Sequence, residues 1–284
     1  MKNKASLFDG RNMERIALLT VLFFLLPALS LLLPEPATAQ SDTLRVFTYN
    51  IQHGRGLDDK VDLRRIAGVI KEKNPHLVTL QEVDMGVNRS DNINIINVLA
   101  GYLDMEPVFF KNISHQDGEY GNGILSSLPL ISSRNQHFVQ PEDAEQRGLL
   151  QTEVDFNGVT IAFMTTHLDN RSEPNRLAGV EQIIETKRAY RGSPVIVSGD
   201  FNALPDSPVH LRMKEYFFDV WEDVGEGVGY TIPPAAPNRR IDYFFYTNNL
   251  VEEDRPKIRA ISMEVIHSEA SDHLPIYAEF EVIR

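Results

Sequence analysis

Residues 194–205 read PVIVSGDFNALP, and this stretch decides how the chain is expected to fold. Pro194 to Ser198 is an apolar run rich in β-branched residues, which predicts a buried strand. Asp200 and Asn202 follow at its end, a carboxylate and an amide two residues apart. Catalytic groups usually collect where strand ends face a common cleft. The stretch therefore predicts a polar site at the edge of a sheet.

Other strands of the chain deliver a polar residue in the same way. These residues are Asn50 after VFTY, Glu82 after LVTLQ, His167 after FMTT, Asp242 after RRI, and Asp272 with His273 before the last strand. Each has a structural explanation when taken alone: a turn former, a turn cap, a buried histidine, or an ion pair of Asp242 with Arg239 or Arg240. Their recurrence along one chain is what indicates a shared site.

Short apolar strands and a few helices are expected around this site. Helices are predicted at 62–72, with Asp62 as N-cap, at 92–100, stopped by Gly101, and at 173–189. Asn157-Gly158 predicts a tight hairpin. Strands are predicted at 44–51, 76–81, 106–110, 123–126, 130–139, 149–156, 159–167, 194–198, 241–246, 258–266 and 276–282. The mixture predicts an α+β sandwich, two sheets face to face with helices outside.

The N-terminal segment, residues 1–39, is predicted to be a signal peptide. A basic start is followed by an apolar run from Ile16 to Leu33 and by the small residues Ala37-Thr38-Ala39. The alternative is a single membrane anchor, because the run is near the lower length limit for spanning a bilayer. Pro27 and the small-residue triplet favour cleavage. We therefore expect a secreted or periplasmic protein, with residues 40–284 forming a single catalytic domain.

Composition limits the partners of the mature chain. Without residues 1–39 it holds 24 Lys and Arg against 37 Asp and Glu, a formal charge of −13. Non-specific nucleic-acid binding normally needs a basic surface, so a small or lipid-derived substrate is favoured over duplex DNA. The absence of cysteine excludes a disulfide framework and a thiolate zinc site.

Seven motifs in this order resemble the endonuclease/exonuclease/phosphatase superfamily over nearly all of residues 44–284. They are TYNI (48–51), LQEVD (80–84), YGNGILSS (120–127), TTHLD (165–169), SGDFNALP (198–205), RRIDYFFY (239–246) and SDHLP (271–275). SGDFN followed by SDH is highly specific, whereas TYNI alone would be weak. The resemblance implies a deoxyribonuclease I-like fold, a four-layer α/β/β/α sandwich of two mostly antiparallel sheets with outer helices. It also implies divalent-metal-dependent hydrolysis of a phosphoester.

The resemblance gives the metal ligands as Glu82, Asn50 and Asp272. A phosphodiester is anionic and repels nucleophiles, so a hard cation with oxygen ligands is needed to neutralise it. Few protein ligands fit Mg²⁺ or Mn²⁺, whereas zinc would call for clustered histidines. Some members of the family carry an acidic second ligand where this chain has Gln52, which favours one ion.

The other residues of these motifs are expected to activate the water and bind the phosphate. Asp200 and Asn202 are expected to point the same way from an extended segment, one taking the proton of the water and the other holding it or a phosphate oxygen. His273 is expected to hydrogen-bond Asp242, and the pair serves either as general base or as a cationic phosphate contact. His167 would stabilise the transition state from the other side.

Further candidates for substrate binding are Tyr120, Asn122, Arg147 and Arg89, the last as a phosphate ligand. Ile241 replaces the cysteine of the Cys-Asp-Arg motif typical of inositol phosphatases, which argues against that branch. Three functions stay open: a hydrolase of small or lipid-derived phosphoesters, a secreted nuclease, and a non-catalytic phosphate- or lipid-binding module. Retention of Glu82, Asp200 and His273 favours the enzymes over the module.

Overall fold

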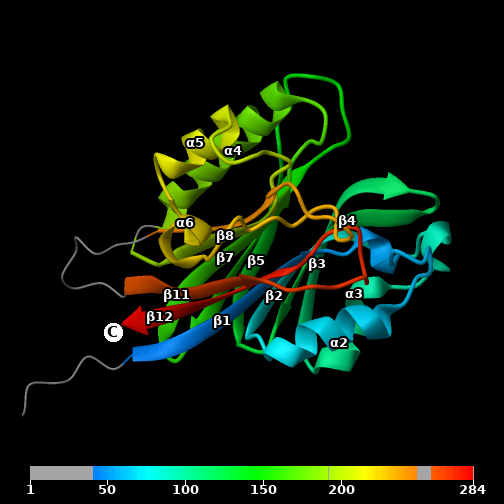
Figure 1. Ribbon diagram of the computed structural model, residues 1–284, viewed down its shortest axis with the longest axis horizontal. Coiled ribbons are helices and arrows are strands. Elements are labelled where there is room, and N and C mark those ends of the chain that lie inside the picture. The colour runs from blue at the N-terminus through cyan, green and yellow to red at the C-terminus, as the bar shows by residue number, and fades with distance from the viewer. Residues whose placement is uncertain (1–40, 191, 248–256, 284) are drawn as a thin grey trace, which may run out of the picture. The chain divides into compact units, whose positions relative to one another are not determined.

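Two six-stranded sheets face each other in the computed structural model, which describes residues 41–190, 192–247 and 257–283 (Figure 1). The first sheet has the order β11-β12-β1-β2-β4-β3 and the second β5-β6-β7-β8-β10-β9. Strands of the first are β1 (Ser41–Asn50), β2 (Leu77–Met85), β3 (Glu106–His115), β4 (Gly118–Ser126), β11 (Lys257–Val265) and β12 (Ile276–Ile283). Strands of the second are β5 (Leu130–His137), β6 (Gly148–Phe156), β7 (Val159–His167), β8 (Val195–Asp200), β9 (Phe218–Asp219) and β10 (Asp242–Tyr246).

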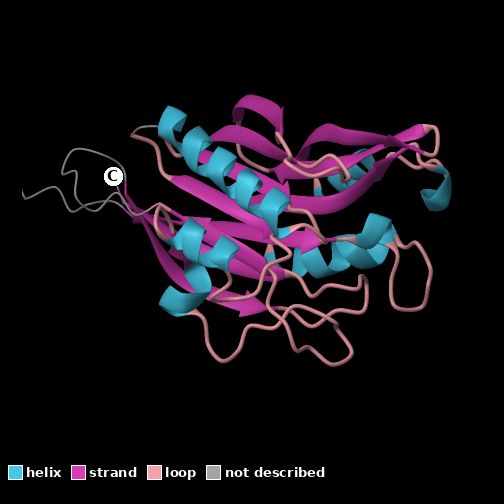
Figure 2. Cartoon of the chain, turned by 90° about the horizontal axis from the view of Figure 1, so that it is seen from above, coloured by secondary structure: helices cyan, strands magenta, loops and turns pink. Residues whose placement is uncertain are grey.

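Helices cover the outer face of each sheet (Figures 1 and 2). Helices α2 (Leu63–Lys73) and α3 (Ile95–Leu103) pack on the first sheet, and α4 (Glu173–Lys187) and α5 (Pro208–Lys214) pack on the second. The short α6 (Val220–Val224) lies against β10 and β11. The predicted four-layer sandwich is confirmed. Among the described residues no helix is long and apolar enough to cross a membrane.

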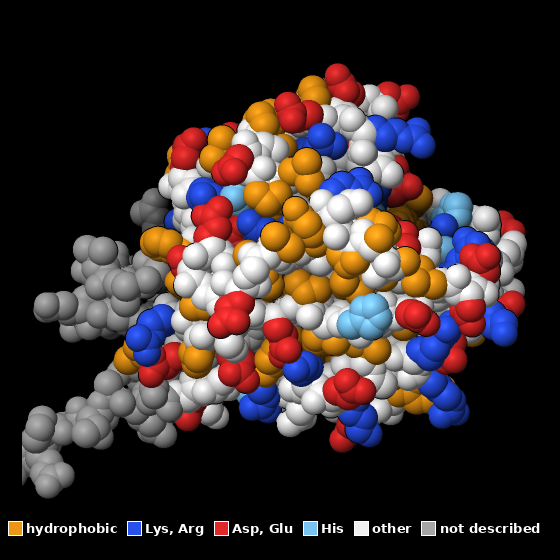
Figure 3. Space-filling model, in the orientation of Figure 1, with side chains coloured by type: hydrophobic (Ala, Val, Ile, Leu, Met, Phe, Trp, Pro, Cys, Tyr) orange, Lys and Arg blue, Asp and Glu red, His pale blue; other side chains and the backbone are white. Residues whose placement is uncertain are grey.

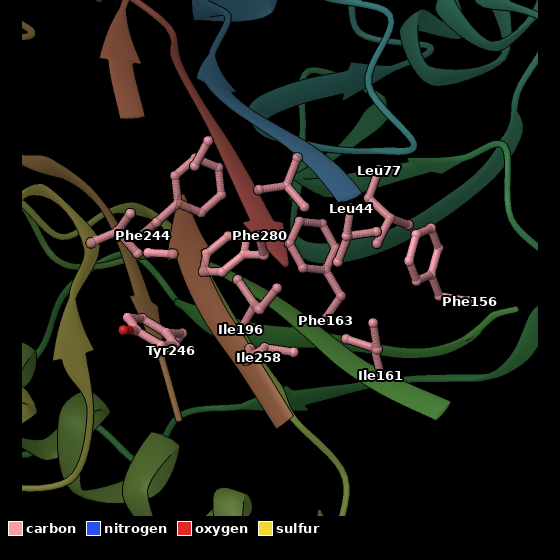
Figure 4. Packing of buried hydrophobic residues seen from close by; sticks show 14 of the residues in the cluster. Leu44, Leu77, Phe156, Ile161, Phe163, Ile196, Phe244, Tyr246, Ile258 and Phe280 are labelled. Atoms are coloured by element: carbon pink, nitrogen blue, oxygen red, sulfur yellow. The ribbon is translucent and has the colours of Figure 1, made fainter. Parts of the chain in front are cut away.

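Among the described residues, three hydrophobic clusters fill the three spaces between these layers. Leu44 and Val46 of β1 pack with Phe163 and Phe244 between the two sheets, as Figure 4 shows for Leu44, Phe163 and Phe244. Their neighbour Phe47 belongs instead to the cluster under α2 and α3. Since side chains along a strand alternate between faces, a continuous apolar strand can serve both gaps.

Each sheet contains one parallel pair of neighbouring strands. β1 runs parallel to β2, and β7 runs parallel to β8 with His167 opposite Asp200. All other pairs of described strands are antiparallel, including β8 and β10, where Asp242 lies opposite Asp200. The carboxyl ends of β1, β7 and β8 and the start of β10 are thereby brought to one edge of the sandwich.

Several local predictions are confirmed and others are wrong. Asp62 caps α2 by accepting hydrogen bonds from two backbone amides, and Asn157-Gly158 turns with positive φ at both residues. Gly101 does not stop α3, which ends two residues later at Leu103 because Asp104 takes the left-handed cap conformation. Strands β3 and β4 extend to meet in a hairpin at residues 116–117, and α5 and α6 were not predicted. The predicted signal peptide, residues 1–39, lies outside the described residues.

Candidate active site

Asn50 joins the two sheets at the edge where the strand ends meet. Its side-chain nitrogen lies 3.1 Å from Oε1 of Glu82 and 3.2 Å from Oδ2 of Asp200. Its backbone oxygen accepts a hydrogen bond of 2.7 Å from the hydroxyl of Ser271, which fixes the SDH segment beside it. The structure thus brings residues from positions 50, 82, 200 and 271–273 to one place, as the sequence predicted.

Glu82 lies inside β2 rather than after it, which corrects the predicted strand end. The pairing of β2 with β4 shifts register between Leu80 and Val83, and Glu82 takes a φ of +59° in this bulge. Bulges re-aim a side chain, and a positive φ in a residue other than glycine is strained. Burial raises the pKa of the Glu82 carboxyl; the hydrogen bond from Asn50 opposes this and the nearby Asp272 adds to it. The backbone therefore places the partly buried carboxylate of Glu82 near the carboxylate of Asp272.

Asp200 is the buried centre of the site. Its Oδ2 lies 3.4 Å from Nε2 of His167 and 3.7 Å from Nε2 of His273. Its Oδ1 accepts a hydrogen bond from the backbone nitrogen of Asn202 at 2.9 Å. Burial, with a contribution from the charge of Asp242, raises the pKa of Asp200 to about 7. A carboxyl with this pKa can exchange a proton near neutrality.

His273 is held as a cation by the carboxylates around it. Its Nδ1 donates to Oδ2 of Asp242 at 2.9 Å, which is the predicted pair. Burial alone would lower the pKa of His273, but the charges of Asp242, Asp200 and Asp272 outweigh it and raise the pKa to about 10. Both ring nitrogens then carry a proton, so His273 can donate but not accept a hydrogen bond.

His167 is neutral, in contrast to His273. Nη1 of Arg147 lies 3.1 Å from Nδ1 of His167, and because a guanidinium only donates, Nδ1 must be the acceptor. Burial and the charge of Arg147 lower the pKa of His167 well below its usual value. Nε2 therefore carries the ring proton and faces Asp200. Arg147 was predicted to bind substrate. In the structure it also donates a hydrogen bond to His167 and so fixes the tautomer of that ring.

The other predicted residues differ in how free their side chains are. Asn202 takes a φ of +47° and its amide donates to the backbone oxygen of Leu168 at 3.0 Å, so it does not point alongside Asp200 as predicted. Arg89 forms two hydrogen bonds of 2.8 Å with Asp84, which leaves less of its guanidinium for a phosphate than predicted.

Asn122 lies on β4 opposite the bulge of β2, and Tyr120, on the same strand, pairs with Asp84 of β2. The ring of Tyr120 is buried beneath the guanidinium of Arg89, 5.1 Å away. The side-chain nitrogen of Asn122 is buried and has no partner among the described residues. An unpaired buried donor opposite the bulge that carries Glu82 suits a phosphate oxygen.

Some residues of the site were not predicted. The hydroxyl of Thr231 donates to Oδ2 of Asp242, on the same oxygen that His273 contacts. Ser271 orients Asn50, as described above. Thr231 lies in a loop without a distinctive pattern, whereas Ser271 is part of the SDH motif and could have been read from it.

The residues fit a divalent cation bound by oxygen. Glu82 and Asp272 are close enough for each charge to act on the other, and the strained bulge holds Glu82 in place. Two neighbouring carboxylates are destabilised without a cation, and the set offers no thiolate. Asp200, Asp242 and His273 also place ligand atoms within 4.8 Å of one another. Their hydrogen bonds to each other, to Thr231 and to Asn50 already occupy these atoms, so Glu82 and Asp272 are the better place for an ion.

The sequence pattern of the endonuclease/exonuclease/phosphatase family matches residues 47–273. The chain belongs to this family. Its members hydrolyse phosphoester bonds, and the described site contains the acids, amide and histidines that this chemistry needs.

Three proteins of known identity or structure are similar to this chain. Tyrosyl-DNA phosphodiesterase 2 of Xenopus laevis is 24% identical over 206 residues, which are 68% of this chain and 52% of that protein. The chain therefore spans about half the length of this relative. A family member from Bacteroides thetaiotaomicron has a TM-score of 0.70 at 15% identity, covering 85% of this chain and 98% of that one. A mannosyl-6-phosphatase of the same species also scores 0.70 at 15% identity, covering 84% and 99%. The two structures support the fold.

Proposed function

We propose that the chain is an exported, divalent-metal-dependent hydrolase that cleaves the P–O bond of a small phosphoester. The observation that carries the proposal is the surroundings of Asp200. Its Oδ2 lies within 3.7 Å of three buried side chains: the neutral His167, the cationic His273 and the amide of Asn50. This combination suits proton transfer and charge stabilisation beside a phosphoryl group.

Glu82, Asp272 and Asn50 would hold a single Mg²⁺ or Mn²⁺ ion. When bound, the ion would neutralise the phosphate and make water easier to deprotonate. The amide of Asn50 now turns its nitrogen toward Glu82 and Asp200. Turning its oxygen toward the ion instead would require rotation about the last side-chain torsion and loss of the hydrogen bond that this oxygen accepts from the backbone nitrogen of Gln52 at 3.2 Å.

Asp200 is the base in this proposal because both nitrogens of His273 carry protons. The water loses a proton to Asp200 and its oxygen forms a bond to phosphorus. The bond from phosphorus to the leaving oxygen breaks, and the leaving alkoxide takes up a proton from solvent to become the alcohol. His167 and His273 donate from Nε2 to phosphoryl oxygens that gain charge, as Asn122 does with its unpaired nitrogen.

Surface charge supports a small substrate. On the face drawn in Figure 3, Lys and Arg are interspersed with Asp and Glu and form no continuous basic field. A duplex nucleic acid would need such a field. The similarity to tyrosyl-DNA phosphodiesterase 2 keeps a secreted nuclease as the second candidate. Export itself rests on residues 1–39.

The decisive experiment is a substrate panel with the purified protein in Mg²⁺ or Mn²⁺. It contains plasmid DNA, sphingomyelin, glycerophosphodiesters, phosphoinositides, sugar phosphates and chromogenic mono- and diesters. We expect hydrolysis of small esters that hardly responds to salt. A nuclease would instead weaken steeply with added salt through counterion release. Failure to cleave any ester would contradict the assignment as an enzyme.

A further inference from the structure

A cavity of about 380 Å³ lies next to His167, between two loops of the second sheet. One loop, residues 138–147, joins β5 to β6, and the other, residues 168–172, joins β7 to α4. Charged lining residues are Glu142, Asp143, Glu145, Arg147, Asp169 and Arg171. Its volume is within the range of ligand pockets, of roughly 300–1,000 Å³.

Hydrogen bonds fix the walls of this cavity without a ligand. Asp169 accepts from the backbone nitrogens of Arg171 and Ser172 at 2.7 and 2.8 Å and from the amide of Asn175 at 3.0 Å. Ser172 donates its hydroxyl to Glu142 on the opposite loop at 2.6 Å. Asn175 also bonds the backbone of Glu142 in both directions. The cavity is therefore preformed, which lowers the entropic cost of binding.

Other polar groups of the cavity are left without partners. Arg147 is only 6% exposed, yet its buried Nε has no partner among the described residues. The side chains of Asp143 and Arg171 are exposed, and among the described residues neither forms a hydrogen bond or an ion pair, so both are open to a ligand. A buried donor without a partner is costly, so Arg147 favours a ligand with an acceptor at this point.

The cavity adjoins the reacting centre through Arg147. One guanidinium nitrogen contacts both Glu145, at 3.0 Å, and Nδ1 of His167, at 3.1 Å. Asp169 follows His167 by two residues. A group esterified to a phosphate at His167 and Asp200 is thus within reach of the cavity.

We propose that this cavity receives the leaving group of the substrate, and that this group is uncharged and carries several hydroxyls, as a hexose or a cyclitol does. The proposal rests on the function proposed above. Four carboxylates against two guanidinium groups repel a second phosphate. An apolar group would leave these charges desolvated without partners. None of the described residues that line the cavity has an aromatic ring to hold a quaternary ammonium. Hydroxyls both donate and accept, so they match Asp143 and Arg171 together.

The test compares leaving groups on matched esters. Hexose 6-phosphate is paired with p-nitrophenyl phosphate, and glycerophosphoinositol with glycerophosphocholine. Arg171→Gln and Asp143→Asn are the probes, and Lys71→Gln, on the exposed side of α2 in the first sheet, is the control. We expect each probe to lower kcat/KM for the hydroxyl-rich esters about tenfold, mainly through KM, since each removes a charged hydrogen bond. The chromogenic ester and the control should stay at wild-type values.

Other outcomes overturn the proposal. An equal loss for both members of a pair would mean that the cavity does not recognise the leaving group. A preference for glycerophosphocholine would replace the hydroxyl-rich ligand by a cationic one. A wild-type protein that hydrolyses no ester contradicts the proposed function separately. In that case, calorimetry measures the affinity of wild type and of Arg171→Gln for hexose 6-phosphate and so tests whether the cavity binds the leaving group. Equal affinities would overturn the assignment.

Discussion

The two sheets use the same device, one parallel strand pair, to reach the site, but they deliver different chemistry. β1 and β2 of the first sheet present Asn50 and Glu82, an oxygen-rich set suited to a cation. β7 and β8 of the second present His167 and Asp200 in register, a set suited to moving protons. Asn50 lies across the boundary and contacts both sides. The difference indicates that metal binding and proton transfer can be altered separately, one sheet at a time.

Asp200→Asn is expected to have the largest effect. The substitution should lower the catalytic rate and leave the stability of the protein nearly unchanged. The amide keeps the size of the side chain but cannot take a proton, so kcat should fall about 10³-fold with little change in the melting temperature. Steady-state kinetics and circular dichroism measure the two quantities. Asp155→Asn, on β6 of the same sheet, is the control and should keep wild-type activity. Activity of Asp200→Asn within tenfold of wild type would exclude Asp200 as the base.

Glu82→Gln is expected to act on the metal instead. Loss of the ligand charge should raise the Mg²⁺ concentration for half-maximal activity by about tenfold or more, and chelation should abolish wild-type activity. Calorimetry with Mg²⁺ and Mn²⁺ checks the same affinity without turnover. Asp200→Asn should bind the ion about as tightly as wild type. If both variants lost affinity equally, the division of labour between the sheets would be wrong.

Residue types at strand ends, together with the family resemblance, predicted which residues form the site, whereas its detailed geometry needed the structure. Asp200 and His167 could be placed because each ends a buried strand, a local pattern. The bulge at Glu82 depends on its pairing with β4, and Asn202 turns away because the backbone oxygen of Leu168 lies in reach. Such long-range partners are not encoded in the neighbouring residues.

The fold shows the same limit. Alternating strands and capped helices predicted the layers, but the long hairpin of β3 and β4 was underestimated although Asp117-Gly118 at its turn is a hairpin signal. The exposed residues of β3 hide its length, since the strand lies at the edge of the sheet. Boundaries at a sheet edge follow from pairing more than from hydrophobicity.

Two glycines at positive φ give a smaller and purely structural comparison between the sheets. Gly199 in β8 has a φ of +131°, and an added Cβ would lie 2.0 Å from the backbone oxygen of Thr166. Gly86, directly after β2, has a φ of +70° and open space around it. Gly199→Ala should lower the free energy of unfolding by about 3 kcal/mol or more, and Gly86→Ala by about 1 kcal/mol. Urea denaturation measures both, and equal losses would show that strain at φ, not the close backbone contact in β8, dominates.

The smallest expected effect lies away from the site, where His76 precedes β2. Its Nδ1 accepts a hydrogen bond of 3.0 Å from the backbone nitrogen of Arg45 in β1. Burial, with a contribution from the charge of Arg45, lowers the pKa of His76 to about 4. The unfolded chain, with an ordinary histidine pKa near 6.5, therefore binds more protons in this window. Stability from His76 is fully present above pH 6.5 and is lost as the pH falls toward 4.

His76→Asn tests this, because an amide oxygen can still accept from Arg45 but does not titrate. Between pH 7.5 and pH 5 the wild type should lose about 1–2 kcal/mol more unfolding free energy than the variant, after allowance for solvent screening. Taking the difference between the two proteins cancels the other acids and histidines, including those at the site. Parallel curves would mean that His76 is protonated equally in both states, and that the pairing of β1 with β2 does not depend on a neutral imidazole.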